Sequence, residues 1–279
     1  MLKVGLAHVG EFGGIESTAA IKSELATALG ANDTFIFNED DGYVREMCAL
    51  TAATKISFGT AGDADYRATN LQLTIDGTSF ELHWPDAQSS SVLLQILGEH
   101  HVMNALASLA VADHFGLDRD AAIGALEAMP LAERWRMQVE HRADGVTVIN
   151  DAYNASPDSM AAALKTLRQV AGPKNRTIAV LGEMAELGEY AGEEQDRLAL
   201  LIVRLGIDQL VVVGDGARRL HISAINEGSW DGESKFYSTP DEAYDYLSSL
   251  LQAGDIVLVK SSNSAKLRFL GDRLGEAYA

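Results

Sequence analysis

Hydrophobic and polar residues follow two different patterns along the chain, one before and one after about residue 130. In the first part, apolar residues at helical spacing alternate with short apolar runs. The predicted elements are strands at 1–8 and 34–37, a strand pair at 67–84, and helices at 17–29, 98–115 and 118–129. Asp76-Gly77 predicts the turn of the strand pair. Ile21, Leu25 and Ala28 recur at helical spacing and predict the first helix, which Gly30 ends.

The second part is more regular, because short apolar runs alternate with longer amphipathic segments. The predicted strands are 146–149, 177–181, 209–213 and 256–259, and the predicted helices are 157–170, 193–205, 217–226, 240–251 and 265–278. Ser156 and Thr239 each precede a proline and an acidic residue, which is typical of a capped helix start. This alternation predicts a mostly parallel sheet covered on both faces. We therefore expect an α/β chain with two domains, 1–131 and 132–279.

Charge and cysteine content narrow the class of protein. The 279 residues contain 22 Lys and Arg against 40 Asp and Glu, a net charge of −18. This balance argues against binding to nucleic acid or to an anionic membrane surface, since both need a basic face. The single cysteine, Cys48, forms no internal disulfide, and no signal peptide or membrane-spanning run is visible. We expect a soluble cytoplasmic protein.

Polar residues follow the predicted strands of the second domain. They are Asp151 with Asn154, Glu183 with Glu186, Asp215, and Lys260 with Ser261 and Ser262. Ligands bind beyond the carboxyl ends of parallel strands, so these residues predict one polar rim. Any one of these groups taken alone is better explained as a solvated loop residue, and it is their occurrence together that favours a site.

Two common nucleotide motifs are absent or incomplete. Gly214-Asp215-Gly216 follows a strand, but Arg219 occupies the third glycine position of a dinucleotide fingerprint, so we reject NAD or FAD binding. The pair Gly-Lys occurs nowhere in the sequence, so the phosphate loop G-x-x-x-x-G-K-[ST] is absent. From their spacing alone, His8 and Lys22 are compatible with a loop histidine and a solvated lysine.

Several short motifs occur in the order and spacing of one enzyme family. They are Gly5-Leu-Ala-His8 with Gly10-Glu-Phe-Gly13, Lys22-Ser-Glu24, Asn38-Glu-Asp40-Asp41, Gly98-Glu-His100 with Asn104-Ala105, Arg134-Trp-Arg136, Asp151-Ala-Tyr-Asn154-Ala-Ser-Pro-Asp-Ser159-Met160 and Gly182-Glu-Met-Ala-Glu-Leu-Gly188. Along its whole length the chain resembles the Mur ligases, in the MurF branch that adds D-alanyl-D-alanine to UDP-N-acetylmuramoyl-tripeptide. The resemblance implies a Mur-ligase central domain, truncated before residue 1, and a Rossmann-like C-terminal domain.

The resemblance also implies an activity. The family is cytoplasmic, serves peptidoglycan synthesis and hence cell shape and division, and uses ATP and Mg²⁺ to convert a carboxylate into an acyl phosphate that the dipeptide amine attacks. His8 resembles the magnesium ligand, and Lys22 the carbamylated catalytic lysine that orients the ion and the substrate. Arg136 resembles the catalytic arginine at the domain junction that reaches the phosphates.

Further roles follow from the same resemblance. His100 and Asn104 are similar to residues that hold the adenine end of ATP, Asp151 to the acid that binds the ribose, and Asn154 shares its turn. Glu186 and Ser262 are implied in substrate binding, and Lys260 in catalysis near the dipeptide and the acyl group. Ser261 and Asn263 depart from the family pattern K-G-S-R, which has glycine and arginine at these positions.

The family's UDP-binding domain and phosphate loop are missing from this sequence. We therefore expect a C-terminal fragment that is inactive alone and self-associates through an uncovered apolar edge of its truncated sheet, whereas the full-length protein is expected to be a monomer. Two alternatives stay open: a non-catalytic nucleotide-binding module, and another ATP-dependent amide ligase such as a folylpolyglutamate synthase. The latter would not be expected to carry the motifs at 151–160 and 182–188 in this form.

Overall fold

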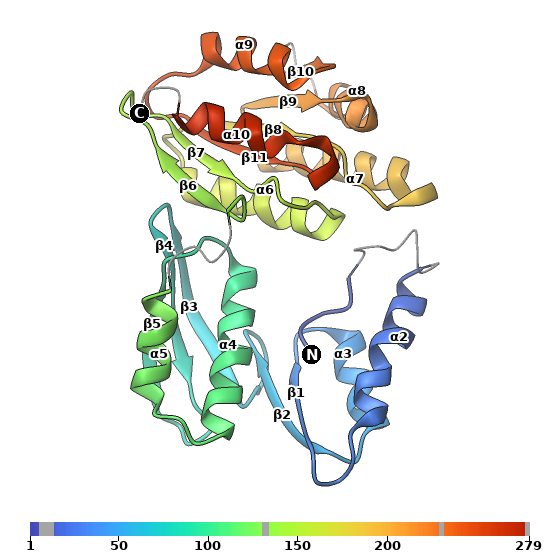
Figure 1. Cartoon of the computed structure of the whole chain (residues 1–279), viewed down its shortest axis with the longest axis vertical. Coiled ribbons are helices and arrows are strands. Elements are labelled where there is room, and N and C mark those ends of the chain that lie inside the picture. The colour runs from blue at the N-terminus through green and yellow to red at the C-terminus, as the bar shows by residue number, and fades with distance from the viewer. Residues whose placement is uncertain (6–13, 130–133, 229–231, 277–279) are drawn as a thin grey trace. The chain divides into compact units, whose positions relative to one another are not determined.

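The structure is a computed structural model that describes residues 1–5, 14–129, 134–228 and 232–276. The chain divides into two compact units, Met1–Pro130 and Leu131–Ala279 (Figure 1). Both units combine a sheet with covering helices, so the predicted α/β class is confirmed.

A five-stranded mixed sheet forms the centre of the N-terminal unit, in the order β1-β2-β3-β4-β5. The first three strands are parallel, and β3, β4 and β5 are antiparallel. The strands are β1 (Thr34–Asn38), β2 (Thr54–Gly59), β3 (Tyr66–Thr74), β4 (Gly77–His83) and β5 (Ser89–Leu94). The helices are α2 (Ile15–Ala28), α3 (Gly42–Glu46), α4 (Glu99–His114) and α5 (Arg119–Glu127), with a short 3₁₀ turn η1 (Met47–Leu50). The predicted strand pair is confirmed as β3 and β4, but β2 and β5 were not predicted.

The helix predicted from Ile21, Leu25 and Ala28 is confirmed as α2, but these apolar residues are not its buried ones. Ile21 and Leu25 are 47% and 53% exposed. The buried residues of the helix are Thr18 and Ala26 instead. Ala26 packs in a small core with Val4 of the chain start, so only a narrow side of α2 is covered in the described part of this unit.

The outer edge of β1 is partly paired. The terminal ammonium of Met1 donates to the Ile36 carbonyl at 2.7 Å, and the Asn38 N–H donates to the Met1 carbonyl at 3.0 Å. Part of the edge that we expected to be uncovered is therefore closed by the start of the chain. Residues 1–5 carry no assigned strand, and the rest of the predicted strand 1–8 lies outside the described residues.

The acidic motif after β1 joins neighbouring loops. The Asp40 carboxylate accepts hydrogen bonds from the Thr60 N–H and hydroxyl at 2.7 and 2.8 Å and from the Ala61 N–H at 3.1 Å. Asp41 caps α3 by accepting from the Val44 N–H at 2.9 Å, and its second oxygen accepts from the Val4 N–H at 3.2 Å. Both carboxylates therefore have a structural role: they bind the backbone of the neighbouring segments.

A six-stranded sheet forms the centre of the C-terminal unit, in the order β10-β9-β8-β11-β7-β6. All neighbours are parallel except β6 and β7, which confirms the expected mostly parallel sheet. The strands are β6 (Gln138–His141), β7 (Thr147–Asn150), β8 (Thr177–Leu181), β9 (Gln209–Val213), β10 (Ser234–Tyr237) and β11 (Ile256–Lys260).

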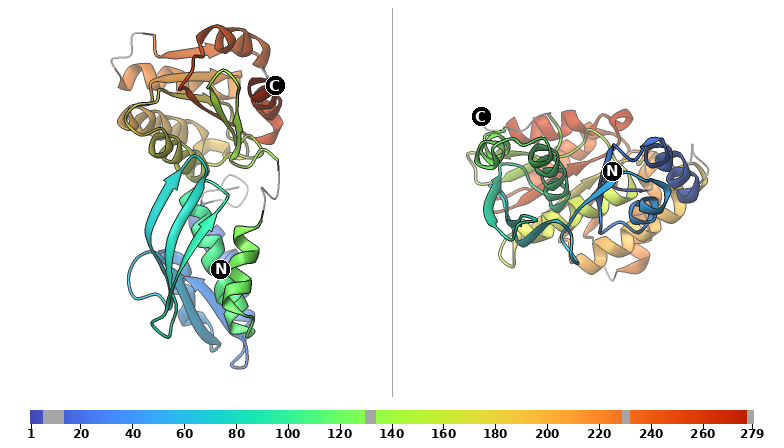
Figure 2. Two further views of the ribbon diagram at one scale, coloured as in Figure 1. Left: turned by 90° about the vertical axis from the view of Figure 1, so that its left-hand side faces the viewer. Right: turned by 90° about the horizontal axis from the view of Figure 1, so that it is seen from below.

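Helices cover both faces of this sheet (Figure 2). Packing places α6 (Pro157–Ala171), α7 (Ala191–Leu205) and α8 (Arg218–Glu227) on one face, and α9 (Pro240–Leu250) and α10 (Leu267–Glu276) on the other. Both predicted helix starts are confirmed: Ser156 caps α6 through Ser159, and Thr239 and Glu242 form a reciprocal capping box at α9.

A charged network surrounds Arg119 at the start of α5 in the N-terminal unit. The Arg119 guanidinium donates to Asp113 at 2.7 and 3.1 Å and to Asp86 at 2.8 Å, and it stacks 4.3 Å from the Trp84 ring. The Tyr66 hydroxyl donates to Asp113 at 2.6 Å. The Arg119 hydrogen bonds hold the pKa of Asp113 below its ordinary value, while burial raises the pKa of Tyr66. The network thus fixes the start of α5 to α4 and the sheet.

We expect Arg119→Met to lower the free energy of unfolding of this unit by about 2 kcal/mol at neutral pH, because charge-assisted hydrogen bonds are lost. Since the folded-state pKa of Asp113 is lowered, its contribution is full above the ordinary Asp pKa and is lost as pH falls through the lowered value. Unfolding curves followed by Trp84 fluorescence at several pH values test this. Arg119→Lys, which keeps the charge, should show a smaller loss; an equal loss at all pH values would contradict the assignment.

Candidate functional site

The sheet topology brings three of the predicted loops together. Because β8, β11 and β7 are adjacent and parallel, the loops that follow them leave the same edge of the sheet. These loops carry Asp151 and Asn154, then Glu183 and Glu186, then Lys260, Ser261 and Ser262. Asp215 follows β9 in a short 3₁₀ turn and pairs with Arg218, the first residue of the next helix, α8.

Lys260 lies at the centre of this edge, 3% exposed. Its ammonium donates to the Asp151 carboxylate at 2.6 Å, to the Asn154 carbonyl at 3.0 Å and to the Asp151 carbonyl at 3.4 Å. An ammonium has three hydrogens, so these contacts use its full donor capacity. Lys260 therefore holds the turn after β7 from inside.

Ser262 connects the same three loops. Its hydroxyl accepts from the Ala185 N–H at 2.7 Å and approaches the Ala155 carbonyl at 3.4 Å, and its N–H donates to the Glu183 carbonyl at 2.8 Å. Ser262 is 3% exposed. The hydroxyl and the N–H of Ser262 thus both bind backbone groups of the neighbouring loops. The side chains of Glu183 and Glu186 remain exposed.

A close approach explains the glycine after β8. A Cβ on Gly182 would lie 2.1 Å from Cδ1 of Leu267 and 2.8 Å from Cβ of Ser261. Ser261, which stands where the family pattern has glycine, is fully buried. The glycine at position 182 therefore leaves room for the side chains of Leu267 and Ser261.

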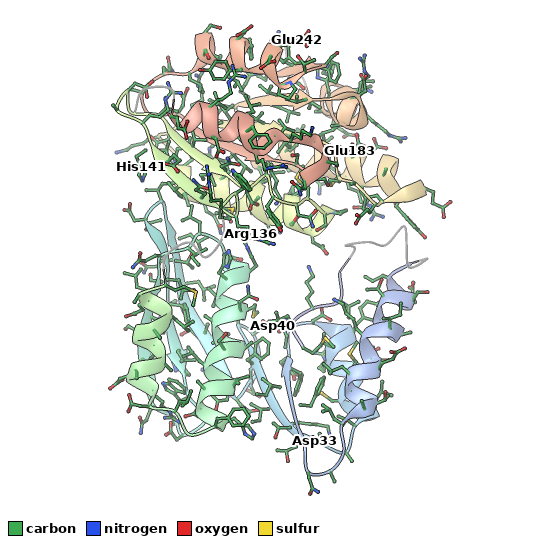
Figure 3. All side chains as sticks on the ribbon, viewed as in Figure 1. Asp33, Asp40, Arg136, His141, Glu183 and Glu242 are labelled. Atoms are coloured by element: carbon green, nitrogen blue, oxygen red, sulfur yellow. The ribbon has the colours of Figure 1, made fainter. Side chains whose placement is uncertain are left out.

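The segment before β6 is pinned against the Asp151 turn. The second Asp151 carboxylate oxygen accepts from the Met137 N–H at 3.0 Å, and the Trp135 carbonyl accepts from the Tyr153 N–H at 3.2 Å. The Arg136 guanidinium stacks 4.2 Å from the Tyr153 ring. Figure 3 labels this exposed arginine at the rim of the C-terminal unit, together with Glu183.

Unusual backbone conformations gather at the same edge. Among the described residues of the C-terminal unit, the non-glycine residues with left-handed φ angles are Trp135 (62°), Met137 (51°), Glu186 (65°) and Lys266 (58°). Such conformations cost about 1–3 kcal/mol each and concentrate at functional sites. Each lies in a loop at the carboxyl-end edge of the sheet, which strengthens the assignment of that edge as the site.

The N-terminal unit carries its own candidates on α4 and α2. His100 and Asn104 are both exposed and lie one helical turn apart on α4. Gly98 precedes them with a φ of 117°, and a Cβ there would lie 2.7 Å from the His100 ring. The exposed Lys22 ammonium donates to the Lys3 carbonyl at 2.6 Å.

The described residues do not assemble a metal centre. In the ranges described above, no group of three or more His, Cys, Asp or Glu is arranged to hold a metal ion. His8, the predicted magnesium ligand, lies outside them. A separate open hollow of about 490 Å³ lies on the β3–β5 sheet, lined by Asn70, Gln72, Ser79, Phe80, Glu81, Ser91, Val92, Leu93 and Glu127, none of which the sequence predicted as a site residue.

Sequence reasoning missed the residues that hold Arg136. Trp135 and Met137 carry no sequence signal for a left-handed backbone, since that conformation is normally expected of glycine, asparagine or aspartate.

The helices of the described segments include none with the length and apolar character needed to cross a bilayer.

Comparison with known proteins identifies both units. The profile of the Mur ligase middle domain matches residues 1–112, and that of the Mur ligase glutamate ligase domain matches residues 135–263. The UDP-N-acetylmuramoyl-tripeptide–D-alanyl-D-alanine ligase of Mycobacterium tuberculosis is 42% identical over 98% of this chain and 57% of the relative. The enzyme of the same name from Escherichia coli is 30% identical over 94% of this chain and 56% of the relative.

Solved structures agree with this result. MurF from Acinetobacter baumannii superposes with a TM-score of 0.85 at 30% identity, covering 99% of this chain and 58% of that protein. MurF from Thermotoga maritima, solved in complex with ADP, shares the fold with a TM-score of 0.83 at 23% identity, over 98% of this chain and 60% of that protein. The chain thus spans 56–60% of the length of these relatives. It belongs to the Mur ligase family and is of the MurF type, carrying the middle domain and the glutamate ligase domain.

Proposed function

We propose that this chain supplies the middle and C-terminal parts of an ATP-dependent ligase that joins D-alanyl-D-alanine to UDP-N-acetylmuramoyl-tripeptide. The observation that carries the proposal is the 42% identity to a ligase of that name over 98% of this chain. The connected loops of Asp151, Lys260 and Ser262 support it, since the shared motifs meet at one sheet edge. The proposed location is the cytoplasm, where this precursor is made.

The residues of this edge fit a nucleotide chemically. Asn154 is exposed, and each Asp151 carboxylate oxygen has a further lone pair beside the bond it already accepts, so both residues suit ribose hydroxyls. The exposed Arg136 offers a planar guanidinium suited to phosphate oxygens. On α4, the exposed side chains of His100 and Asn104 suit the edge of an adenine ring. In a protein of net charge −18, Arg136 supplies the local positive charge that a phosphorylated ligand requires.

The proposed reaction has two steps. A carboxylate oxygen of the tripeptide attacks the γ-phosphorus, and the bond to ADP breaks to give an acyl phosphate. The dipeptide amine then attacks the acyl carbon, loses a proton, and inorganic phosphate leaves. Arg136 would neutralise charge on the transferred phosphoryl group, which is the main requirement of such chemistry.

The magnesium chemistry is proposed for residues of the N-terminal unit. Mg²⁺ would supply charge neutralisation at the phosphates. His8 is its proposed ligand, and we derive no step through the ion. Lys22 is the proposed site of carbamylation; a carbamate keeps one N–H on that nitrogen, so the bond to the Lys3 carbonyl is compatible with the modified side chain.

The described contacts favour supporting roles for two proposed site residues. The Lys260 ammonium donates its hydrogens to Asp151 and Asn154, and the Ser262 hydroxyl is hydrogen-bonded to neighbouring loops. We propose that both act on the catalytic and substrate groups by shaping the loops. Glu186, exposed in its left-handed conformation, is the proposed contact for the dipeptide substrate.

The decisive experiment joins this chain to the preceding residues of the M. tuberculosis relative. We expect the chimera to release ADP only when ATP, the muramoyl tripeptide precursor and D-Ala-D-Ala are all present. The 279 residues alone should be inactive, because their sequence lacks G-x-x-x-x-G-K-[ST]. ADP release and product formation by mass spectrometry measure both.

The controls separate the alternatives. Activity with a folate and glutamate would favour a folylpolyglutamate synthase, and ATP binding without ligation would favour a non-catalytic module. In the chimera, Arg136→Ala should lower kcat by about 100-fold. Arg197→Ala, which removes another exposed arginine that pairs with Glu193 and Glu194 on α7, should leave kcat unchanged.

Removing the buried cation should destabilise the C-terminal unit. Lys260→Met leaves the Asp151 carboxylate, which is 14% exposed, without its cation, and we expect a loss of about 3 kcal/mol. Adding Asp151→Asn should recover part of the loss, because no uncompensated charge remains. Amide exchange of β11 under native conditions measures it. Arg218→Ala, at the exposed Asp215 pair, should change little, and a Lys260→Met effect as small would contradict this account.

We further propose that the 279-residue chain self-associates through the α2 stripe, defined as Ile21 and Leu25. Ile21→Glu with Leu25→Glu should lower the apparent mass in light scattering across a concentration series. The matched control is Ile222→Glu with Ile225→Glu, two similarly exposed residues on α8. A chain that is monomeric at every concentration would contradict this proposal, as would an equal effect of the control.

A further inference from the structure

Arg136 sits between two residues whose backbones are strained. Trp135 and Met137 both have left-handed φ angles, although neither is glycine. Such a backbone persists only where its surroundings hold it. Met137 is held on one side by its N–H bond to Asp151.

Asp272 on α10 provides the main hold. The Trp135 indole N–H points at both of its carboxylate oxygens, each 3.0 Å away. The Phe269 ring, on the same helix, packs edge-on to the indole with ring centres 6.2 Å apart. The Trp135 N–H also donates to the Gln138 side chain at 3.1 Å. The indole is therefore fixed to α10 by a hydrogen bond and a ring contact.

Asp272 is itself oriented by other groups. One oxygen accepts from Nδ2 of the buried Asn150 at 3.1 Å, and the other accepts from Arg134 at 3.1 Å. A Cβ on Gly271 would lie 2.4 Å from the Asn150 side chain, so the helix backbone approaches the end of β7 closely here. Asp272 is 17% exposed and is well placed to act as a rigid acceptor.

We propose that Asp272 is a positioning residue for Arg136: by holding the Trp135 indole, it fixes the strained turn that stacks the Arg136 guanidinium on the Tyr153 ring. The Trp135 carbonyl accepts from the Tyr153 N–H, so the residue that Asp272 holds is also tied to the backbone of the residue on whose ring Arg136 stacks. The functional part of this inference rests on the proposed role of Arg136 at the phosphates. A preset guanidinium loses less conformational freedom when it meets an anion.

The test uses the 279-residue chain without any ligand. A guanidinium stacked on an aromatic ring has a ring-current-shifted Nε–H resonance, which Tyr153→Leu abolishes and so calibrates. We expect Asp272→Ala to move the Arg136 Nε–H most of the way to that reference. It should also move the Trp135 indole resonance and speed trypsin cleavage after Arg136 by about tenfold, as expected of a released segment.

Further variants separate positioning from general stability. Trp135→Phe removes only the indole donor and should reproduce the Arg136 shift. Asp272→Asn keeps an oxygen acceptor for the indole N–H, so the Arg136 resonance should stay close to its position in the unchanged chain. Asp241→Ala breaks the exposed ion pair of Arg273 on the same helix and should leave the resonance in place. An Arg136 resonance unchanged in both Asp272→Ala and Trp135→Phe would overturn the proposal. Since no turnover is measured, this result is independent of the ligase assay.

Discussion

The loops at the carboxyl-end edge of the C-terminal sheet depend on the buried ion pair between Lys260 and Asp151. It joins the ends of β11 and β7, which are neighbours in the sheet but 109 residues apart in the chain. A charge buried to 3% exposure is stable only with a partner and with its remaining donors satisfied, and the Asn154 and Asp151 carbonyls provide this. With Lys260 in place, Asp151 has one oxygen left to hold Met137, so the segment that carries Arg136 depends on the same pair.

The sequence predicts the strands of the C-terminal sheet where burial is complete on both faces. The segments β8, β9 and β11 each contain four consecutive apolar residues and have every residue buried, and all three were predicted. The missed strands lack this signal. β10 is a half-buried edge strand, and β5 begins with three serines and buries only Val92 and Leu94. These strands are defined by their hydrogen-bonded pairing with a neighbouring strand, which the pattern of their side chains does not predict.

Helix periodicity identified α2 but not the side on which it packs. Ile21 and Leu25 are more hydrophobic than Thr18, yet Thr18 is buried and they are not. A hydrophobic pattern reports which face would gain from burial, whereas burial depends on what lies opposite. Motif spacing was more informative about the site, because loops that follow adjacent parallel strands must meet at one edge. The meeting of Asp151, Lys260 and Ser262 follows from this rule.

What spacing cannot supply is the conformation of the groups that meet. Asp272 lies 137 residues from Trp135 in the sequence, and no periodicity relates them. The left-handed backbone of Trp135 is unfavourable by itself and exists because an indole bond, a ring contact and a carbonyl bond together outweigh its cost. The same balance explains Ser261 beside Gly182, where a larger residue at one position requires the smallest at the other. In both cases the residue type is intelligible only with its distant partner, so such features become visible when the folded chain supplies that partner.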